Sequence, residues 1–410
     1  MTQLTVSTCR SQNWLDPYLS SFEEMLIGKK YSAATIKPYL VLVRRLARLM
    51  DADGIAPEAL TTELAAYLVR DEERHCKRRN KCKNIAKRFA EHLMELGVVP
   101  APVPTAQQIV RREFRISYEN YLDRQRGLSP RTIGHAWGFA NRFFDFRFGT
   151  NDIDLAVLTP DDIISFLHNL LTAKPPYRDK TPSTHLRCLF QYLFKTGATK
   201  VNLALCVPSV AQRWDARLPR YLSPDQIEAI LGSVRAKPKN GARDYAMILL
   251  MARLGLRAPE VIVIQLDDID WRAGELLVRG KGKRHDRLPL PHDVGEALAA
   301  YIRHERVSTS RTLFVKRRAP NGPFECGEVA NNILKGAFAA TGIKPPSPYV
   351  GSHVLRHSLA TSMVRKGASL AEVGDVLRHR SRTSTMIYAK MDLDGLRSIA
   401  QAWPLAGDVQ

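Results

Sequence analysis

The sequence predicts a mainly α-helical protein that carries one small antiparallel β-sheet. Apolar residues recur at helical spacing through most of the chain, and one helical pattern occurs twice in the first half. Only residues 269–290 change to two short apolar strands around a turn rich in glycine and lysine, which is typical of a β-hairpin. With 410 residues, 45% of them hydrophobic, the chain is long enough for two or three domains.

The first half of the chain contains an internal repeat. Three segments recur at a nearly constant offset of 97 to 100 residues, as duplicated helical units do. The matching pairs are 29–50 with 126–147, 60–68 with 158–167, and 89–97 with 189–197. We therefore expect one helical domain at residues 1–100 and a second at residues 107–200, joined by the proline-rich stretch 101–105.

Helix starts in the second repeat are marked by capping residues. Ser129 precedes Pro130 and Thr159 precedes Pro160, so a side-chain acceptor stands before a proline at the first helical position.

A third domain is expected at residues 217–402. Ser223 with Gln226 forms a capping box around a first-turn proline, and Gly255 is a natural terminator for the long apolar helix before it. After the hairpin the pattern is helical again, apart from the basic loop at 315–323.

The charge of the chain favours a polyanionic partner. Lysine and arginine number 61 against 41 acidic residues, which gives a formal charge of +20. Charge alone does not separate DNA from RNA or from an acidic membrane. No apolar run reaches the roughly 18 residues of a spanning helix, and acids within residues 1–25 are unlike a signal peptide. We therefore expect a cytoplasmic protein without a membrane partner.

The six cysteines predict neither disulfides nor a metal site. They are scattered without any CxxC pair. His75, Cys76 and Cys82 could suggest a metal site, but the stretch from Arg74 to Arg88, both included, holds eight basic residues and no acid, and such a field repels a cation. No metal and no other cofactor is expected.

Two motifs place single cations at rigid turns. In GLRAPEV, Arg257 follows the helix terminator, and Glu260 lies three residues later. In VRGKGKRHD, Lys281 lies between two glycines at the hairpin tip, where the backbone can approach a phosphate closely. Taken alone, the first is more simply a surface ion pair with Glu260, and the second a solvated hairpin tip.

Two further motifs add histidines, another arginine and a tyrosine. In SHVLRHSLAT, helical spacing brings His353 and Arg356 onto one face, where they can bind phosphate oxygens, although any polar helix face would look the same. In SLAEVGDVLRH, a capping box begins a helix, and His379 falls at its end. A short helix then presents Tyr388, whose phenol becomes a nucleophile only if nearby cations stabilise the phenolate and a bound phosphate.

Together these motifs resemble the site of the tyrosine recombinases, the lambda-type phage integrase family. That family orders its site as arginine, lysine, His-x-x-Arg, histidine or tryptophan, then tyrosine. The matching residues here are, in order, Arg257, Lys281, His353, Arg356, His379 and Tyr388. The resemblance spans residues 217–395, and 107–200 resembles the helical core-binding domain of the family, with 1–100 as a related unit.

The resemblance implies a mechanism and an architecture. The helical and catalytic domains would form a DNA clamp, and Tyr388 would attack one phosphate to give a 3′-phosphotyrosyl link and a free 5′-hydroxyl. Lys281 would be the general acid, the two arginines and His379 would bind the phosphate, and His353 would assist proton transfer. Four protomers on two duplexes, with or without companion recombinases, would exchange strands without metal or ATP.

The sequence departs from the family pattern at two places and leaves two other functions open. Pro259 stands where the family usually has a small polar residue, and Lys283 and Arg284 accompany Lys281 in the turn. The alternatives are relaxation of DNA in the manner of a type IB topoisomerase and a catalytically silent DNA-binding regulator. The doubled helical region favours a transposon or another integrative element as the DNA that the enzyme serves.

Overall fold

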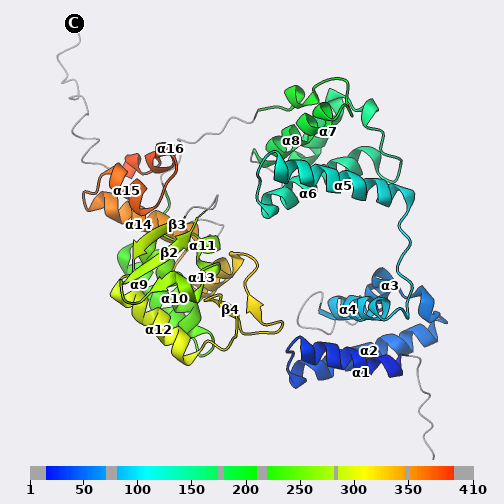
Figure 1. Ribbon diagram of the computed structural model, residues 1–410, viewed down its shortest axis with the longest axis horizontal. Coiled ribbons are helices and arrows are strands. Elements are labelled where there is room, and N and C mark those ends of the chain that lie inside the picture. The colour runs from blue at the N-terminus through cyan, green and yellow to red at the C-terminus, as the bar shows by residue number, and fades with distance from the viewer. Residues whose placement is uncertain are drawn as a thin grey trace, which may run out of the picture. The chain divides into compact units, whose positions relative to one another are not determined.

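The computed structural model confirms a mainly helical chain with small antiparallel sheets (Figure 1). It describes residues 15–70, 81–173, 180–209, 219–280, 285–346 and 351–391. Tertiary contacts divide the chain into two compact units, one made of residues 1–99 and 215–410, the other of residues 100–214. Within the described ranges, no helix has both the length and the apolar character that crossing a membrane requires.

Residues 15–99 form a helical bundle with its own apolar core. Its helices are α1 (Asp16–Gly28), α2 (Ala33–Ala52), α3 (Thr62–Leu68) and α4 (Lys81–Glu95). The rings of Phe22 and Phe89, both fully buried, meet edge to face with centroids 5.0 Å apart. Cys82, part of the motif for which a metal site was weighed and set aside, is buried in this core.

Residues 100–214 repeat that plan around an aromatic core. Their helices are α5 (Ala106–Arg124), α6 (Pro130–Phe148), α7 (Pro160–Thr172) and α8 (Thr181–Lys195). The predicted cap at Ser129 is confirmed, since its Oγ accepts from the Thr132 amide at 3.3 Å. At Thr159 the side chain is not the acceptor that was expected, because the hydroxyl and the backbone N–H of this residue both donate to the Asp162 carboxylate at 2.9 Å. Phe143 packs edge to face on two other phenylalanine rings.

The order of elements supports the internal repeat. Within the described residues, α1 and α2 are followed by a 3-10 turn at Pro57–Ala59 and then by α3 and α4. In the same order, α5 and α6 are followed by a 3-10 turn at Leu155–Val157 and then by α7 and α8. The offset between the two turns is close to that of the sequence repeat. The exact limits of three domains stay a prediction.

Residues 219–391 pack helices around one central, buried helix. The helices are α9 (Pro224–Arg235), α10 (Gly241–Leu254), α11 (Ala258–Ile262), α12 (His292–His304), α13 (Glu328–Thr341), α14 (His353–Arg365), α15 (Leu370–Val376) and α16 (Arg382–Met386). Most side chains of α10 are buried, which fits a helix that is apolar on all sides. Figure 1 shows α14, α15 and α16 together at one end of this part.

The strands of this part form two sheets. The strands β1 (Ile269–Asp270), β2 (Glu275–Arg279) and β3 (His285–Pro289) form the predicted antiparallel hairpin and its extension. Leu276 and Val278 of β2 point into the core. The segment expected to be a loop at 315–323 instead pairs β4 (Val315–Lys316) with β5 (Gly322–Pro323), because its two ends lie opposite each other.

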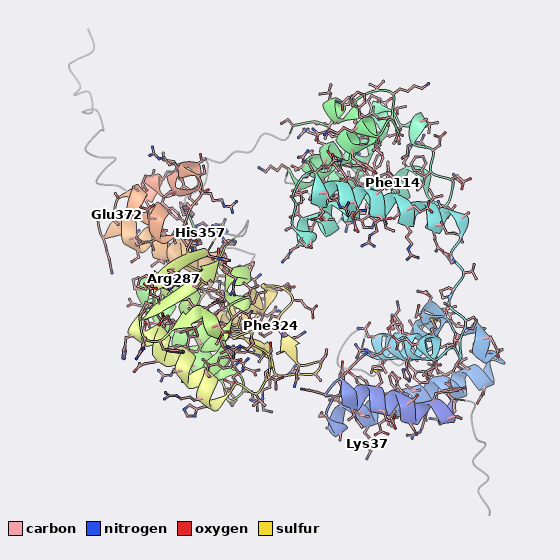
Figure 2. All side chains as sticks on the ribbon, in the orientation of Figure 1. Lys37, Phe114, Arg287, Phe324, His357 and Glu372 are labelled. Carbon is pink, nitrogen blue, oxygen red and sulfur yellow. The ribbon has the colours of Figure 1, made fainter. Side chains whose placement is uncertain are left out.

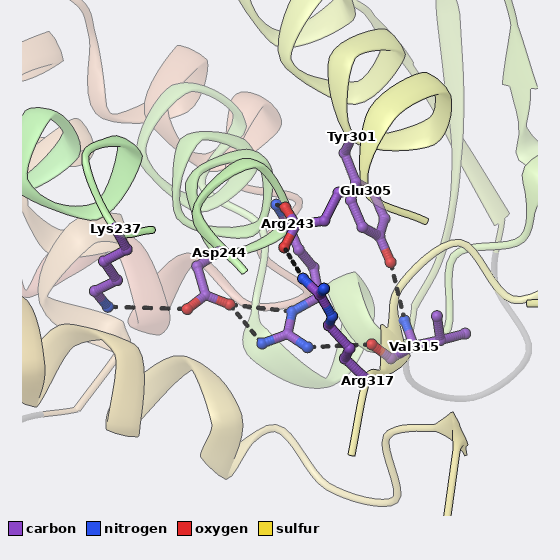
Figure 3. A network of polar contacts seen from close by, with 7 residues as sticks. All are labelled: Lys237, Arg243, Asp244, Tyr301, Glu305, Val315 and Arg317. Atoms are coloured by element: carbon purple, nitrogen blue, oxygen red, sulfur yellow. Dashed lines mark hydrogen bonds and ion pairs between the residues drawn. The ribbon is translucent and has the colours of Figure 1, made fainter. Parts of the chain in front are cut away.

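A buried polar network connects α10 to its neighbours (Figure 3). The guanidinium of Arg243 binds Asp244 at 2.7 Å and donates to the Val315 carbonyl at 3.2 Å. The backbone amide of Arg243 donates to Glu305 at the end of α12. These contacts hold Val315 at the start of β4, and Glu305 at the end of α12, against the first turn of α10.

Candidate active site

The turn at Gly255 sets the position of the first arginine. Gly255 has φ of 62°, in the left-handed region, and a Cβ there would lie 2.6 Å from a methyl group of Leu377. Only glycine satisfies both the backbone and the close approach of the neighbouring segment. The chain therefore leaves α10 in a fixed direction, and Arg257 becomes the N-cap of α11.

Arg257 is held by Glu260, as its motif suggested. One oxygen of the Glu260 carboxylate accepts the Arg257 backbone N–H at 2.8 Å, and the other accepts from Nη1 at 2.8 Å. The Glu260 side chain is 7% exposed, whereas the Arg257 side chain is 37% exposed. The ion pair with Glu260 leaves Arg257 able to bind a phosphate, because it orients the guanidinium while part of the side chain still reaches solvent.

Arg356 joins two of the segments that build the site. Its side chain is buried in α14 and donates from Nη1 to the Gly255 carbonyl and from Nη2 to the Leu377 carbonyl. These carbonyls lie two residues before Arg257 and two residues before His379. Burial, together with the like charge of Arg257, lowers the pKa of Arg356 to about 10, so it stays cationic at neutral pH.

Tyr388 is buried against α14 rather than exposed among basic residues. The residue is 1% exposed, and its hydroxyl lies 2.7 Å from Nδ1 of His357. Burial raises the pKa of Tyr388 to about 12, although Arg356 and Arg257 act in the opposite direction. Figure 2 labels His357 beside the end of residues 219–391 that holds α14, α15 and α16. With so high a pKa the phenol keeps its proton at neutral pH. It can react as a nucleophile only if another group accepts that proton or another positive charge stabilises the phenolate.

His379 stacks near the tyrosine. It follows α15 by three residues instead of ending it, and its ring is parallel to that of Tyr388 with centroids 6.4 Å apart. Its Nδ1 lies 2.7 Å from Thr385 Oγ1. Tyr388 itself lies between α16 and a 3-10 turn, Ala389–Met391, where one short helix was expected. Burial and the nearby arginines lower the pKa of His379 to about 4, so the ring is neutral at pH 7.

His353 begins α14 one turn before His357. Its ring is solvent-exposed, and the centroids of the two histidine rings are 6.4 Å apart. It stands on the same helix as Arg356, as the His-x-x-Arg spacing predicts.

The structure thus brings five of the six expected side chains together, from the N-cap of α11, from α14 and from the segment after α15. Lys281 lies in residues 281–284, outside the described part of the chain, so its place in the site stays a prediction. The strand β3, which begins at His285, approaches the same residues through Asp286, whose carboxylate lies 3.7 Å from Nε of Arg378.

Three residues of the site were not chosen from the sequence. Glu260 binds two arginines, His357 bonds to the tyrosine, and Arg378 shares Glu260 with Arg257. The available signals were weak: Glu260 is three residues from Arg257, and His357 is one turn from His353. Nothing in the sequence around Arg378 distinguishes it from the other arginines of 378–382.

The described residues hold no group of three or more histidine, cysteine, aspartate or glutamate side chains suited to a metal ion. The cations that the structure describes at this position are arginines, and guanidinium groups can bind phosphate oxygens directly. The chemistry that this site supports is therefore nucleophilic attack by a phenol on a phosphate held by guanidinium groups.

The half-buried His357 and His379 predict a loss of stability in mild acid. Burial is the main cause that lowers the pKa of His357 and of His379 to about 4, from 6.5. Between these values the unfolded chain binds more protons than the folded one, so the free energy of unfolding falls as the pH drops from 6.5 to 4. Melting temperatures across this range should fall less steeply for His357→Gln and His379→Gln. Slopes equal to that of the parent protein would contradict this assignment, since carboxylates titrate alike in all three.

Comparisons with known proteins agree with this chemistry. Residues 220–393 match the model of the phage integrase family. A Sinorhizobium fredii protein described as an integrase/recombinase is 42% identical over 289 residues, which cover 70% of each chain. The tyrosine recombinase XerD of Mycobacterium tuberculosis is 29% identical, over 72% of this chain and 99% of its own.

A solved structure shares the fold. The lambda integrase fragment bound to a core site aligns with a TM-score of 0.51 and 18% identity, over 72% of this chain and 99% of the fragment. The site geometry, the family match and the 42% identical relative lead to one conclusion: this chain belongs to the tyrosine recombinases of the phage integrase family.

Proposed function

We propose that this enzyme cuts and rejoins double-stranded DNA at specific sites, with Tyr388 as the nucleophile. The observation that carries the proposal is the buried phenol of Tyr388. Its hydroxyl is hydrogen-bonded to His357, and the charges of Arg356 and Arg257 act to lower its pKa. Attack of the phenolic oxygen on a backbone phosphate forms a 3′-phosphotyrosyl bond and breaks the bond to the 5′ oxygen. The bond energy is kept in the intermediate, so strand rejoining needs no ATP.

Each cation then has a distinct task. Arg257 and Arg356 neutralise the charge that builds on the non-bridging oxygens in the transition state. His379 donates a hydrogen bond to the same phosphate, and His353, exposed on α14, assists proton transfer. The leaving 5′ oxygen needs a proton as the bond breaks, and Lys281 of the hairpin turn supplies it. The product 5′-hydroxyl reverses these steps when it attacks the phosphotyrosyl bond of a partner strand.

Recognition of DNA depends mainly on phosphate contacts. The helical region at 107–200 and the catalytic region at 217–402 form a clamp around the duplex, and residues 1–100 add a related helical unit. The net charge of +20 supports this arrangement. Because such contacts release counterions, binding weakens steeply as salt concentration rises.

Exchange of strands requires more than one copy. We propose four protomers on two duplexes, with or without companion recombinases, since each duplex offers two strands to be cut. The element served is a transposon or another integrative element, and the enzyme works in the cytoplasm, where it meets such DNA.

A nicked substrate tests the reaction itself. DNA with a nick close to the cleavage site loses a short fragment after attack, which prevents rejoining and traps the adduct. We expect a protein–DNA adduct that survives denaturation by detergent and forms in the presence of a metal chelator. A catalytically silent regulator would bind the same DNA and give no adduct.

A plasmid assay separates recombination from simple relaxation. Plasmids with paired sites, taken from the ends of the element, should give exchanged products. A supercoiled plasmid without such sites should be relaxed slowly or not at all. Rapid relaxation without exchange would favour the topoisomerase-like alternative.

A further inference from the structure

Arg378 adopts a backbone conformation that its residue type disfavours. It follows α15 with φ of 54°, in the left-handed region. For a residue with a Cβ this conformation costs about 1 kcal/mol or more, and glycine avoids that cost. The side chain must therefore form contacts that offset the strain.

One of those contacts connects Arg378 to Glu260, which also binds Arg257. Arg378 Nη2 donates to Oε2 of Glu260 at 2.9 Å, and its Nε lies 3.7 Å from Asp286 of β3. The Arg378 side chain is 9% exposed and that of Glu260 is 7% exposed, whereas that of Asp286 is 41% exposed. Nη1 of Arg378 is buried and has no hydrogen-bond partner within the described residues. The contact with Glu260 is thus the shorter and the better shielded of the two.

Because Arg257 and Arg378 share the Glu260 carboxylate, the net charge around Arg257 is more positive than in a simple ion pair. A buried glutamate paired with Arg257 alone would form a neutral pair and weaken its attraction for a phosphate. With Arg378 on the same carboxylate, the three groups carry a net charge of +1 before the more exposed Asp286 is counted. Both guanidiniums also fix the carboxylate, so Glu260 has less freedom to turn Arg257 away from the site.

We propose that Arg378 is a positioning residue that acts through Glu260 to hold Arg257 in place for the scissile phosphate and to give the cluster of Arg257, Glu260 and Arg378 a net positive charge. The inference rests on the proposed phosphotyrosyl chemistry. It assigns to Arg378 no contact with DNA, because its side chain is only 9% exposed and its Nη2 donates to Glu260.

The first test replaces Arg378 with glycine. Glycine suits the left-handed backbone, so the fold should persist, which a thermal melt checks. Adduct formation on the nicked substrate should slow by about 10- to 100-fold, as expected for a misplaced catalytic group. Arg378→Lys keeps the positive charge but lacks the planar guanidinium. Its rate of adduct formation should lie between that of the parent protein and that of Arg378→Gly. Arg272→Ala, which removes an exposed arginine from the turn between β1 and β2, is the matched control and should stay within about twofold.

Two modified substrates then separate the routes by which Arg378 could act. A methylphosphonate at the scissile position removes the negative charge that Arg257 must stabilise. A bridging 5′ sulfur leaves as a thiolate and so needs no proton from a general acid. If Arg378 acts through Arg257, the defect of Arg378→Gly shrinks to a few-fold on the methylphosphonate and persists on the sulfur substrate.

The reverse pattern would overturn the proposal, because rescue by sulfur alone would mean that Arg378 serves the hairpin through Asp286. Unchanged adduct formation by Arg378→Gly would also overturn it. Asp286→Asn, which alters only the longer contact, should reduce the rate by less than about threefold. Failure of the parent protein to form any adduct would refute the proposed function instead, so the two failures remain distinguishable.

Discussion

Replacing Tyr388 with phenylalanine is expected to abolish the protein–DNA adduct while the protein remains folded and bound to DNA. The substitution removes only the phenolic oxygen, which we propose attacks the phosphate, and loss of a nucleophile lowers turnover by about a thousandfold or more. The ring stays in its apolar cluster with Leu377 and Val373. Losing the bond to His357 should lower the free energy of unfolding by about 0.5 to 1.5 kcal/mol. The adduct is measured on the nicked substrate, and binding by mobility shift at fixed salt.

Tyr221 provides the matched control. It packs against the same apolar cluster, and its hydroxyl accepts a hydrogen bond from Arg365 at the end of α14. Tyr221→Phe therefore removes a hydroxyl of the same kind from the same neighbourhood without touching the nucleophile. Adduct yields should match those of the parent protein. An undiminished adduct in Tyr388→Phe would show that a different residue attacks the phosphate.

The sequence predicted those parts of the fold that depend on local patterns. The cap at Ser223 with Gln226, the terminator Gly255 and the β2–β3 hairpin all occur as expected, because each depends on residues close in sequence. The sequence also predicted that His353 and Arg356 share one helix, α14, because the His-x-x-Arg spacing is helical.

The remaining features depend on contacts between distant segments. Glu260 and Arg378 are 118 residues apart, so no local pattern announces their ion pair. The burial of Tyr388 was also unexpected, because its neighbours in sequence are basic while its neighbours in space are apolar. The positive φ of Arg378 has no sequence signal at all, since arginine is not a residue that favours it.

Replacing Arg356 with alanine should have the second large effect, on stability and on catalysis together. The buried guanidinium donates to the carbonyls of Gly255 and Leu377, and alanine would leave both oxygens without that partner. A buried polar group without a partner costs about 1 to 3 kcal/mol, so the free energy of unfolding should fall by roughly 2 to 6 kcal/mol. Urea denaturation measures this loss, and Arg365→Ala, at the exposed end of the same helix, is the control.

The same substitution also tests whether the site is held together from within. Arg356 bonds to the residues two positions before Arg257 and two before His379, so its loss should displace both segments as well as remove a phosphate ligand. Adduct formation should drop by at least about 100- to 1,000-fold at temperatures where the variant is still folded. Arg356→Lys, which can reach one carbonyl but not both, should recover part of the stability and little of the rate. If lysine restored the rate fully, a single positive charge would suffice, and the paired carbonyl contacts would matter only for folding.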